Sequence, residues 1–150
     1  MAPERLTTRP ARYLGALLLI ATGAVHLQQY YGVYYRVIPL VGPLFVANFV
    51  IGVVLGLALL LPIERFTRWA PGLVALGGMA FAAGTIIGLE ISETGTLFGF
   101  HEHGYRSAIV LSIAFEGAAI VSLGAYALAS FRGRRSAEQP VLVRSSAAQT

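Results

Sequence analysis

The chain has no cysteine, lysine or aspartate, and charged residues make up only 12% of its 150 residues. Without cysteine there is no disulfide, no cysteine-ligated zinc or iron–sulfur centre and no thiol nucleophile. So little charge excludes a disordered chain and a nucleic-acid-binding domain, and it leaves too few polar side chains to coat a soluble globule of this size. Nucleic acid is therefore not expected as a partner.

The sequence is instead rich in hydrophobic residues, which gather in long runs. Hydrophobic residues make up 56% of the chain, and the mean hydropathy is +0.69. These runs are almost free of charged residues, as is typical of membrane-spanning segments. We predict four transmembrane helices, over residues 13–31, 43–61, 71–91 and 107–131. The shortest would reach about 28 Å at about 1.5 Å per residue, which matches a hydrocarbon core of about 30 Å.

Short loops between the runs predict an all-α polytopic membrane protein, an antiparallel bundle of four transmembrane helices over residues 13–131. Pro43 and Pro71 fit the first turns of the second and third helices, where a missing N–H costs nothing. Residues 1–12 would form an N-terminal arm. Residues 132–150 have nothing to bury, so we expect a disordered tail there.

A cleaved signal peptide is the alternative interpretation of the first run. A basic leader precedes this run and small residues such as Gly23 follow within it, as in secretory signals. Apolar and aromatic residues continue beyond that point, and no soluble domain follows them. The pattern therefore favours a retained first helix.

The distribution of arginine predicts the orientation in the membrane. Nine arginines fall in the arm, in the loop between the second and third helices or in the tail: Arg5, Arg9, Arg12, Arg65, Arg68, Arg132, Arg134, Arg135 and Arg144. Only Arg36 and Arg106 fall on the other side. The positive-inside rule then predicts a multi-pass protein of the cell (plasma) membrane with both termini in the cytoplasm.

Small residues on two helices predict close helix packing. The second helix carries Asn48, Gly52 and Gly56, and the third carries Gly77, Gly84 and Gly88. Such spacing lets two backbones approach closely. We favour contacts within one chain over a homodimer interface, because every helix of a bundle needs neighbours.

Four polar residues lie where lipid would penalise them: His26, Asn48, Glu90 and Glu116. Counted from the helix ends, all lie in the outer half of the membrane or at its midplane, and Glu116 is deepest, about 15 Å below Arg106. A charged carboxylate at the bilayer centre costs about 2.5–3.5 kcal/mol, so Glu116 should be protonated or paired, and His26 is the best partner by depth. The cluster is either a ligand or proton site open to the outside or a buried hydrogen bond that fixes the helix register.

Helical phase supports a shared interior for part of this cluster. His26 and Gln29 lie on one face of the first helix, and Ser112 and Glu116 are one turn apart on the fourth. Glu90 projects away from the glycines of its own helix. Either the third helix therefore contacts partners on two sides, or Glu90 reaches the outer headgroups.

The outer loop contains two histidines, His101 and His103, with Glu93 and Glu102 nearby. In an extended segment both imidazoles would face one side and could bind a metal ion, with a carboxylate as oxygen donor. The alternative is that two histidines in an exposed, glycine-rich loop are simply solvated.

No cofactor is required by the sequence. A haem would need an axial ligand such as His26, and a bis-histidine site would need His101 at matching depth, which requires the loop to dip inward.

Three features of the chain occur together: Gly23 and His26 in the first helix, an aromatic outer loop, and the apolar run 38–45. In this layout, residues 11–130 resemble the small four-helix integral membrane proteins of high-GC bacteria, in the size class of the DoxX-like proteins. The resemblance implies a membrane-embedded bundle, and it assigns no catalytic residue.

Three functions are consistent with these features. The first is a binding, accessory or scaffold component of the membrane, whose partners are the lipid bilayer and other membrane subunits or a second copy. The second is a membrane redox protein that carries haem or quinone near His26, and the third is a transporter or channel subunit in which Glu116 handles a cation or proton. No nucleophile, phosphate-binding loop or ligand set indicates an enzyme.

Overall fold

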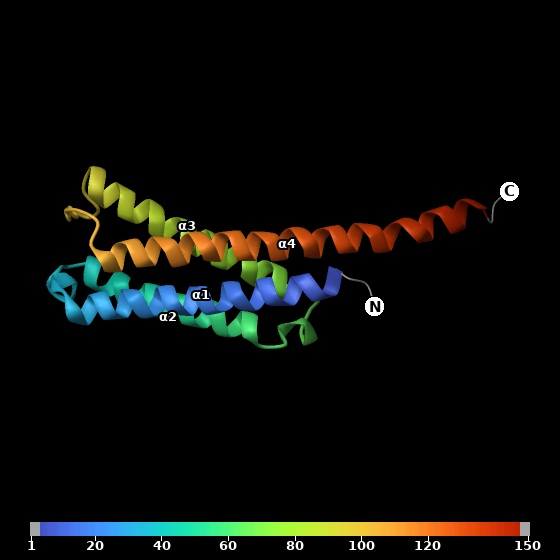
Figure 1. Ribbon diagram of the computed structural model, residues 1–150, viewed down its shortest axis with the longest axis horizontal. Coiled ribbons are helices and arrows are strands. Elements are labelled where there is room, and N and C mark those ends of the chain that lie inside the picture. The colour runs from blue at the N-terminus through green and yellow to red at the C-terminus, as the bar shows by residue number, and fades with distance from the viewer. Residues whose placement is uncertain (1–3, 148–150) are drawn as a thin grey trace.

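The computed structural model describes the backbone of residues 4–147 and the side chains of residues 9–132. Four long helices form the bundle: α1 (Glu4–Gly32), α2 (Val41–Leu60), α3 (Ala70–Thr94) and α4 (Ser107–Ala147) (Figure 1). Two short 3-10 helices, η1 (Tyr34–Val37) and η2 (Ile63–Arg65), lie in the first two connections. Residues 4–147 contain no β-strand, so the predicted all-helical bundle is confirmed.

The two ends of the bundle differ, and we name them for use below. One end carries η1 and the 95–106 segment and is called the η1 end. The opposite end carries both termini and η2 and is called the terminal end.

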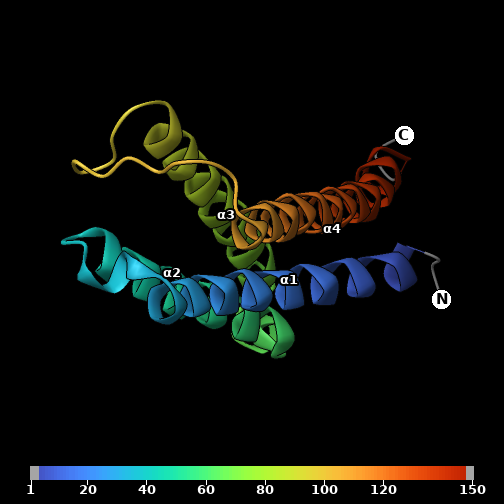
Figure 2. The same cartoon turned by 60° about the vertical axis from the view of Figure 1, so that its left-hand side comes forward.

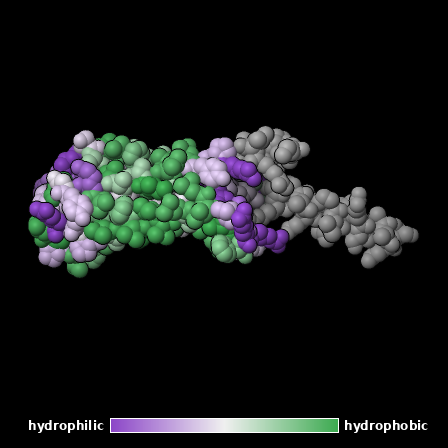
Figure 3. Space-filling model, turned by 90° about the horizontal axis from the view of Figure 1, so that it is seen from below, coloured by the Kyte–Doolittle hydropathy of each residue, from purple (hydrophilic) through white to green (hydrophobic). Residues whose placement is uncertain are grey.

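All four helices are long and apolar enough to cross a membrane. The spans are Arg9–Gly32, Val41–Leu60, Ala70–Thr94 and Ser107–Arg132. Each helix also exposes large hydrophobic side chains, such as Leu17, Val54, Leu73 and Val121. These side chains contribute to a hydrophobic belt between hydrophilic ends (Figure 3), which is the surface of a multi-pass membrane protein.

Two helix ends differ from the sequence prediction. α1 begins at Glu4 rather than at residue 13, and α4 continues to Ala147, through most of the tail predicted to be disordered. Both extensions prolong a helix that is already formed, so they need no new nucleus, and arginine and alanine are good helix formers. The predicted tail beyond residue 147 lies outside the described residues.

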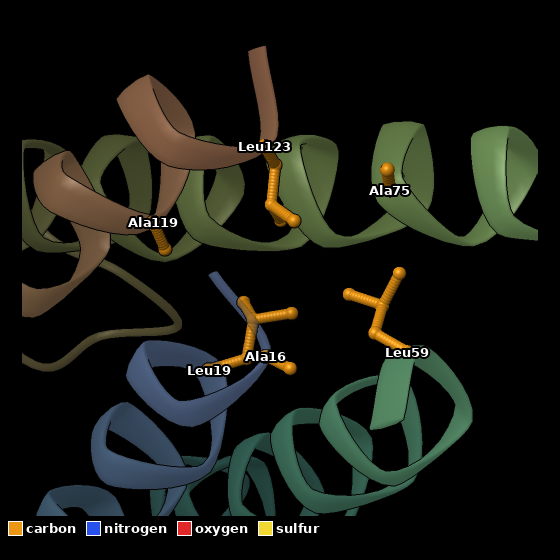
Figure 4. Packing of buried hydrophobic residues seen from close by; sticks show 6 residues of the cluster. All are labelled: Ala16, Leu19, Leu59, Ala75, Ala119 and Leu123. Atoms are coloured by element: carbon orange, nitrogen blue, oxygen red, sulfur yellow. The ribbon is translucent and has the colours of Figure 1, made fainter. Parts of the chain in front are cut away.

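The hydrophobic core is formed by small and branched side chains from all four helices. It consists of Ala16 and Leu19 on α1, Leu59 on α2, Ala75 on α3, and Ala119 and Leu123 on α4 (Figure 4). α1 packs mainly against α2 and α4, whereas α3 packs chiefly against α4 and less against α2. The bundle is therefore centred on α1.

Glycines bring α1 and α2 into backbone contact. A Cβ atom at Gly52 would lie 2.7 Å from the carbonyl oxygen of Leu19, and one at Gly56 would lie 2.7 Å from that of Ala16. Gly23 on α1 approaches the backbone of Phe49 in the same way. The close contact predicted for the second helix is therefore confirmed, and it lies within the chain.

The close contact predicted for the third helix is wrong. A Cβ atom at Gly84 would meet nothing within 4 Å, and Gly77 and Gly88 have only ordinary side-chain contacts. The packed glycine is Gly78, whose Cβ would lie 2.8 Å from a methyl group of Leu19. The physical reason is that α3 diverges from α1 and α2 toward the η1 end (Figure 2), so its later glycines have no neighbouring helix to approach.

Arg12 fixes the terminal end of α2. Its side chain is buried, with Nε donating to the carbonyl oxygen of Leu59 (2.6 Å), Nη2 to that of Leu61 (2.5 Å) and Nη1 to Glu64 (3.1 Å). Carbonyl groups at a helix C-terminus lack intrahelical donors and carry partial negative charge, so a cation satisfies them. The sequence indicated Arg12 only as one charge of the topology count.

The substitution Gly52→Ala tests the contact between α1 and α2. The new methyl group would collide with the Leu19 carbonyl, and we expect the free energy of unfolding to fall by about 1–3 kcal/mol. The matched control is Gly72→Ala on α3, where a Cβ meets nothing within 4 Å; it should be neutral or stabilising by up to about 1 kcal/mol. Thermal unfolding in mild detergent, followed by circular dichroism, compares the two. Equal midpoints would contradict the assigned contact.

Candidate ligand-binding cavity

A cavity of about 400 Å³ lies among the four helices at the η1 end. Its walls come from α1, α2, α3 and α4, and Tyr35 of η1 together with Leu97, Phe100 and Glu102 covers its η1 side. The walls are mostly apolar, with a few polar groups among them. This size and composition are typical of sites that bind small molecules.

The cavity brings together three of the four polar residues singled out from the sequence. His26, Asn48 and Glu116 all line it, and they come from α1, α2 and α4. Gln29 and Ser112, the neighbours expected from helical phase, line it as well. The shared interior predicted for this part of the cluster is therefore present.

Glu90 lies apart from the other three. Its side chain is exposed near the η1 end of α3, where the Tyr105 hydroxyl donates to Oε1 at 2.8 Å. Glu90 does not line the cavity. Of its two interpretations, the one in which Glu90 reaches the surface at the helix end fits this position.

Glu116 is the most deeply placed charged group of the site. Only 2% of it is exposed, and it lies about 14 Å along α4 from Ser107. The Ser112 hydroxyl donates to Oε1 at 3.1 Å, and Thr85 of α3 is a second hydrogen-bonding neighbour. Within residues 9–132, no arginine or histidine pairs with this carboxyl group.

His26, the best partner for Glu116 by depth, does not hydrogen-bond to it among the described residues. Its Nδ1 instead contacts the Thr22 carbonyl oxygen, one turn back on α1, at 2.9 Å. A carbonyl oxygen only accepts, so Nδ1 carries the proton and Nε2 of the neutral ring is an acceptor. The local bond prevails because it requires no movement between helices.

Gln29 presents a buried acceptor with no protein partner. Its side chain is 6% exposed, its Nε2 donates to Gln28 at 2.6 Å, and its Oε1 has no hydrogen bond among the described residues. A buried acceptor left unpaired costs about 1–3 kcal/mol. Because Gln29 lines the cavity, a molecule in the cavity is the available donor.

A polar cluster of Tyr35, Glu102 and Arg106 covers the η1 side of the cavity. The Tyr35 hydroxyl donates to Glu102, and Arg106 donates to the Tyr35 hydroxyl and to both carboxylate oxygens of Glu102, the latter at 3.1 Å. The Tyr35 ring stacks on Phe45 with the centroids 4.3 Å apart. Glu102 is buried, so its charge is balanced by Arg106 in place of water.

The same environment disfavours ionisation of Tyr35. Burial raises the pKa of its hydroxyl above the ordinary value, and the hydrogen bond to Glu102 raises it further. Tyr35 therefore stays a hydrogen-bond donor throughout the neutral pH range.

No local pattern in the sequence indicates this cluster. Tyr35 and Glu102 are 67 positions apart, so no local spacing joins them. In the sequence, Tyr35 is one of several aromatic residues of the outer loop, Glu102 is a possible metal ligand and Arg106 is a charge that indicates orientation. Only the folded structure, which buries Tyr35 and Glu102 and places Arg106 beside them, shows their connection.

The cavity opens sideways between α2 and α3. Three of its lining residues are exposed: Leu44 on α2, and Ala80 and Gly84 on α3. α3 diverges from α2 at this end (Figure 2), and no Cβ at Gly84 would meet another atom. These residues lie within helices that are long and apolar enough to span a membrane.

The two loop histidines lie next to each other. The rings of His101 and His103 are 4.4 Å apart between centroids, and both residues are exposed. His101 Nδ1 contacts the Gly95 carbonyl oxygen. Among the described residues, no group of three or more potential metal ligands is present, so the pair lacks the carboxylate ligand considered for it.

No family model, curated protein or solved structure matches this chain. The fold and the cavity define a bundle of four helices, each long and apolar enough to cross a membrane, with an internal cavity near the η1 end.

The substitution Tyr35→Phe tests the polar cluster. Loss of a hydroxyl bonded to two charged groups should lower the free energy of unfolding by about 1.5–3 kcal/mol near neutral pH. The control is Tyr34→Phe, because Tyr34 is exposed. Chemical or thermal unfolding in detergent measures both.

The pH dependence of this loss has a definite sign. The folded state raises the Tyr35 pKa, so the stabilisation is complete below the ordinary tyrosine pKa of about 10 and declines as the pH rises above it. The gap between wild type and Tyr35→Phe should therefore be constant from pH 7 to 9 and shrink at higher pH. A gap that widens above pH 10 would contradict the assigned hydrogen bonds.

Proposed function

We propose that the protein binds a small lipophilic molecule in its cavity and that this molecule arrives from the bilayer between α2 and α3. The cavity itself is the observation that carries the proposal. Its volume of about 400 Å³ suits a small organic ligand, and its mostly apolar walls suit a molecule that dissolves in lipid. The protein would act as a binding component of the membrane, alone or as an accessory subunit, and no reaction is assigned to it.

The orientation proposed for the protein places this site in the outer half of a bacterial cell membrane. The terminal end carries Arg9, Arg65 and Arg68, whereas Arg36 and Arg106 lie at the η1 end. This bias favours cytoplasmic termini, and the layout resemblance to membrane proteins of high-GC bacteria favours a plasma membrane. The polar cluster of Tyr35, Glu102 and Arg106 would then separate the ligand from the external water.

Filling the cavity tests the proposal. The probe is N-phenyl-1-naphthylamine, a neutral molecule that fluoresces in apolar surroundings, titrated into the protein in mild detergent. We expect saturable binding to the wild type and at least tenfold weaker binding, about 1.4 kcal/mol, to Gly84→Leu. Gly84 faces open space in the cavity wall, so the larger side chain occupies the ligand volume and leaves the helix packing intact.

The control for this experiment is Gly117→Leu on α4. Gly117 also has no atom within 4 Å of a Cβ position, and it does not line the cavity. It should therefore bind the probe like the wild type. Absence of saturable binding to the wild type, or equal binding to both variants, would overturn the proposed function.

His26 supports a second candidate, a redox protein that carries haem. Its Nδ1–H bond to the Thr22 carbonyl leaves Nε2 without a proton in a residue of the cavity wall. Histidines that bind metal ions are oriented by this kind of backbone bond. The other two imidazoles of the chain, His101 and His103, do not line the cavity, so His26 would be the single protein ligand.

An absorption spectrum of the protein purified from its native membrane tests this candidate. A haem protein would show a stoichiometric Soret band that shifts on reduction with dithionite, and His26→Ala would abolish it. The exposed His101→Ala is the control and should keep the band. A featureless visible spectrum would exclude the haem candidate and leave the binding of a colourless ligand as the proposed function.

A further inference from the structure

The chemistry of the cavity walls allows the ligand class to be narrowed, and this step rests on the proposed function. We propose that the ligand is a lipophilic amine that binds as a cation, with its ammonium group paired to Glu116 and its apolar body in the remaining volume of the cavity.

The charges around the cavity leave Glu116 as the one group without a balancing partner. Four titratable side chains line the cavity: His26, Tyr35, Glu102 and Glu116. Glu102 is paired with Arg106 at 3.1 Å, and Tyr35 donates its proton to Glu102. His26 satisfies Nδ1 on its own helix. A second acid, Glu116, therefore remains, and its hydrogen-bonding neighbours Ser112 and Thr85 are both neutral.

A carboxyl group at this depth avoids the cost of an isolated charge in two ways, by keeping its proton or by pairing with a cation. The described part of the chain supplies no cation to Glu116, whereas it supplies Arg106 to Glu102 and Arg12 to Glu64. Glu64 at the terminal end and Glu102 at the η1 end thus each have an arginine partner. The acid inside the cavity has space beside it instead, because Gly84 and Gly88 form part of the same wall.

Two further polar atoms in the cavity wall are acceptors that lack a hydrogen-bond donor among residues 9–132. Gln29 Oε1 is a buried acceptor without a partner, and Nε2 of neutral His26 is an acceptor as well. An ammonium group has N–H donors and positive charge together. An anion such as a phosphate lacks the positive charge and would be repelled by ionised Glu116, and a quinone offers acceptors only, so these classes match the cavity poorly.

The apolar part of the wall suits the remainder of such a ligand. Phe45, Phe81 and Phe100 contribute aromatic rings, and ring faces attract cations within about 6 Å of the ring centroid. Amines with an apolar body partition into bilayers, and the opening between α2 and α3 faces lipid. Charge, donor chemistry and route of access therefore point to the same class.

A series of ligands that differ only in charge tests the inference on the wild-type protein. The three compounds are 1-adamantanamine, its neutral isostere 1-methyladamantane and the anion 1-adamantanecarboxylate, each used to displace N-phenyl-1-naphthylamine in the same detergent. We expect the amine to bind at least tenfold more tightly than the neutral isostere, and the carboxylate to bind most weakly. A neutral compound or an anion that binds as tightly as the amine would overturn the inference, as would displacement by none of the three.

Glu116→Gln identifies the group responsible. The amine should lose its advantage in this variant, with at least tenfold weaker binding, while the affinity for 1-methyladamantane should be unchanged. The matched control is Glu90→Gln, an exposed acid outside the cavity, which should bind all three compounds like the wild type. An amine affinity that is equal in wild type and Glu116→Gln would overturn the assignment.

The outcomes separate this inference from the proposed function. If the fluorescent probe binds saturably and the charge series fails, the cavity binds a ligand of another class. If the probe itself shows no saturable binding to the wild type, the proposed function fails and the inference fails with it. The charge series requires no substitution, so it decides the question even if Glu116→Gln does not fold.

Discussion

Backbone contact between α1 and α2 is the constraint on which the rest of the bundle depends. At Gly52 and Gly56 the two helices are so close that no side chain fits between them. In lipid there is little hydrophobic force to hold helices together, so such close packing supplies much of the attraction. With α2 fixed on one side of α1 and α4 on the other, α3 finds its main contacts on α4 and diverges at the η1 end. The cavity is the space that this divergence leaves.

At each end of the bundle, an arginine pairs with a glutamate and donates hydrogen bonds to neighbouring polar groups. At the terminal end Arg12 satisfies the last carbonyl groups of α2 and pairs with Glu64, and at the η1 end Arg106 balances Glu102 beside Tyr35. Each arginine donates several hydrogen bonds from one planar group, which suits a crowded helix end. Both clusters lie at the ends of the spans, where charge is least costly.

Much of the fold could be predicted from the sequence because the relevant signals are local. The runs without charge located four spans to within a few residues, and Pro71 lies in the first turn of α3 as expected. Helical phase also placed His26, Asn48 and Glu116 toward a common interior. The cluster of Tyr35, Glu102 and Arg106 could not be predicted, because its members are brought together by packing between distant segments. Gly84 lines the cavity and does not pack against a neighbouring helix, because α3 diverges there. The spacing of glycines along one helix does not predict the direction of that helix.

The space around Glu116 supports our proposal that this residue serves a ligand and does not only fix the helix register. A polar bond that serves only to fix register is best placed in a packed interface, where neighbouring side chains fill the volume and enforce one geometry. Glu116 and Ser112 are one turn apart on the same helix, so their bond aligns no second helix, and Thr85 of α3 is the neighbour that connects Glu116 to another helix. Around them lies a cavity of about 400 Å³ whose wall includes Gly84, where an added Cβ would meet no atom within 4 Å. A buried acid beside open volume, with a second unpaired acceptor on Gln29, is an arrangement that a bound donor completes.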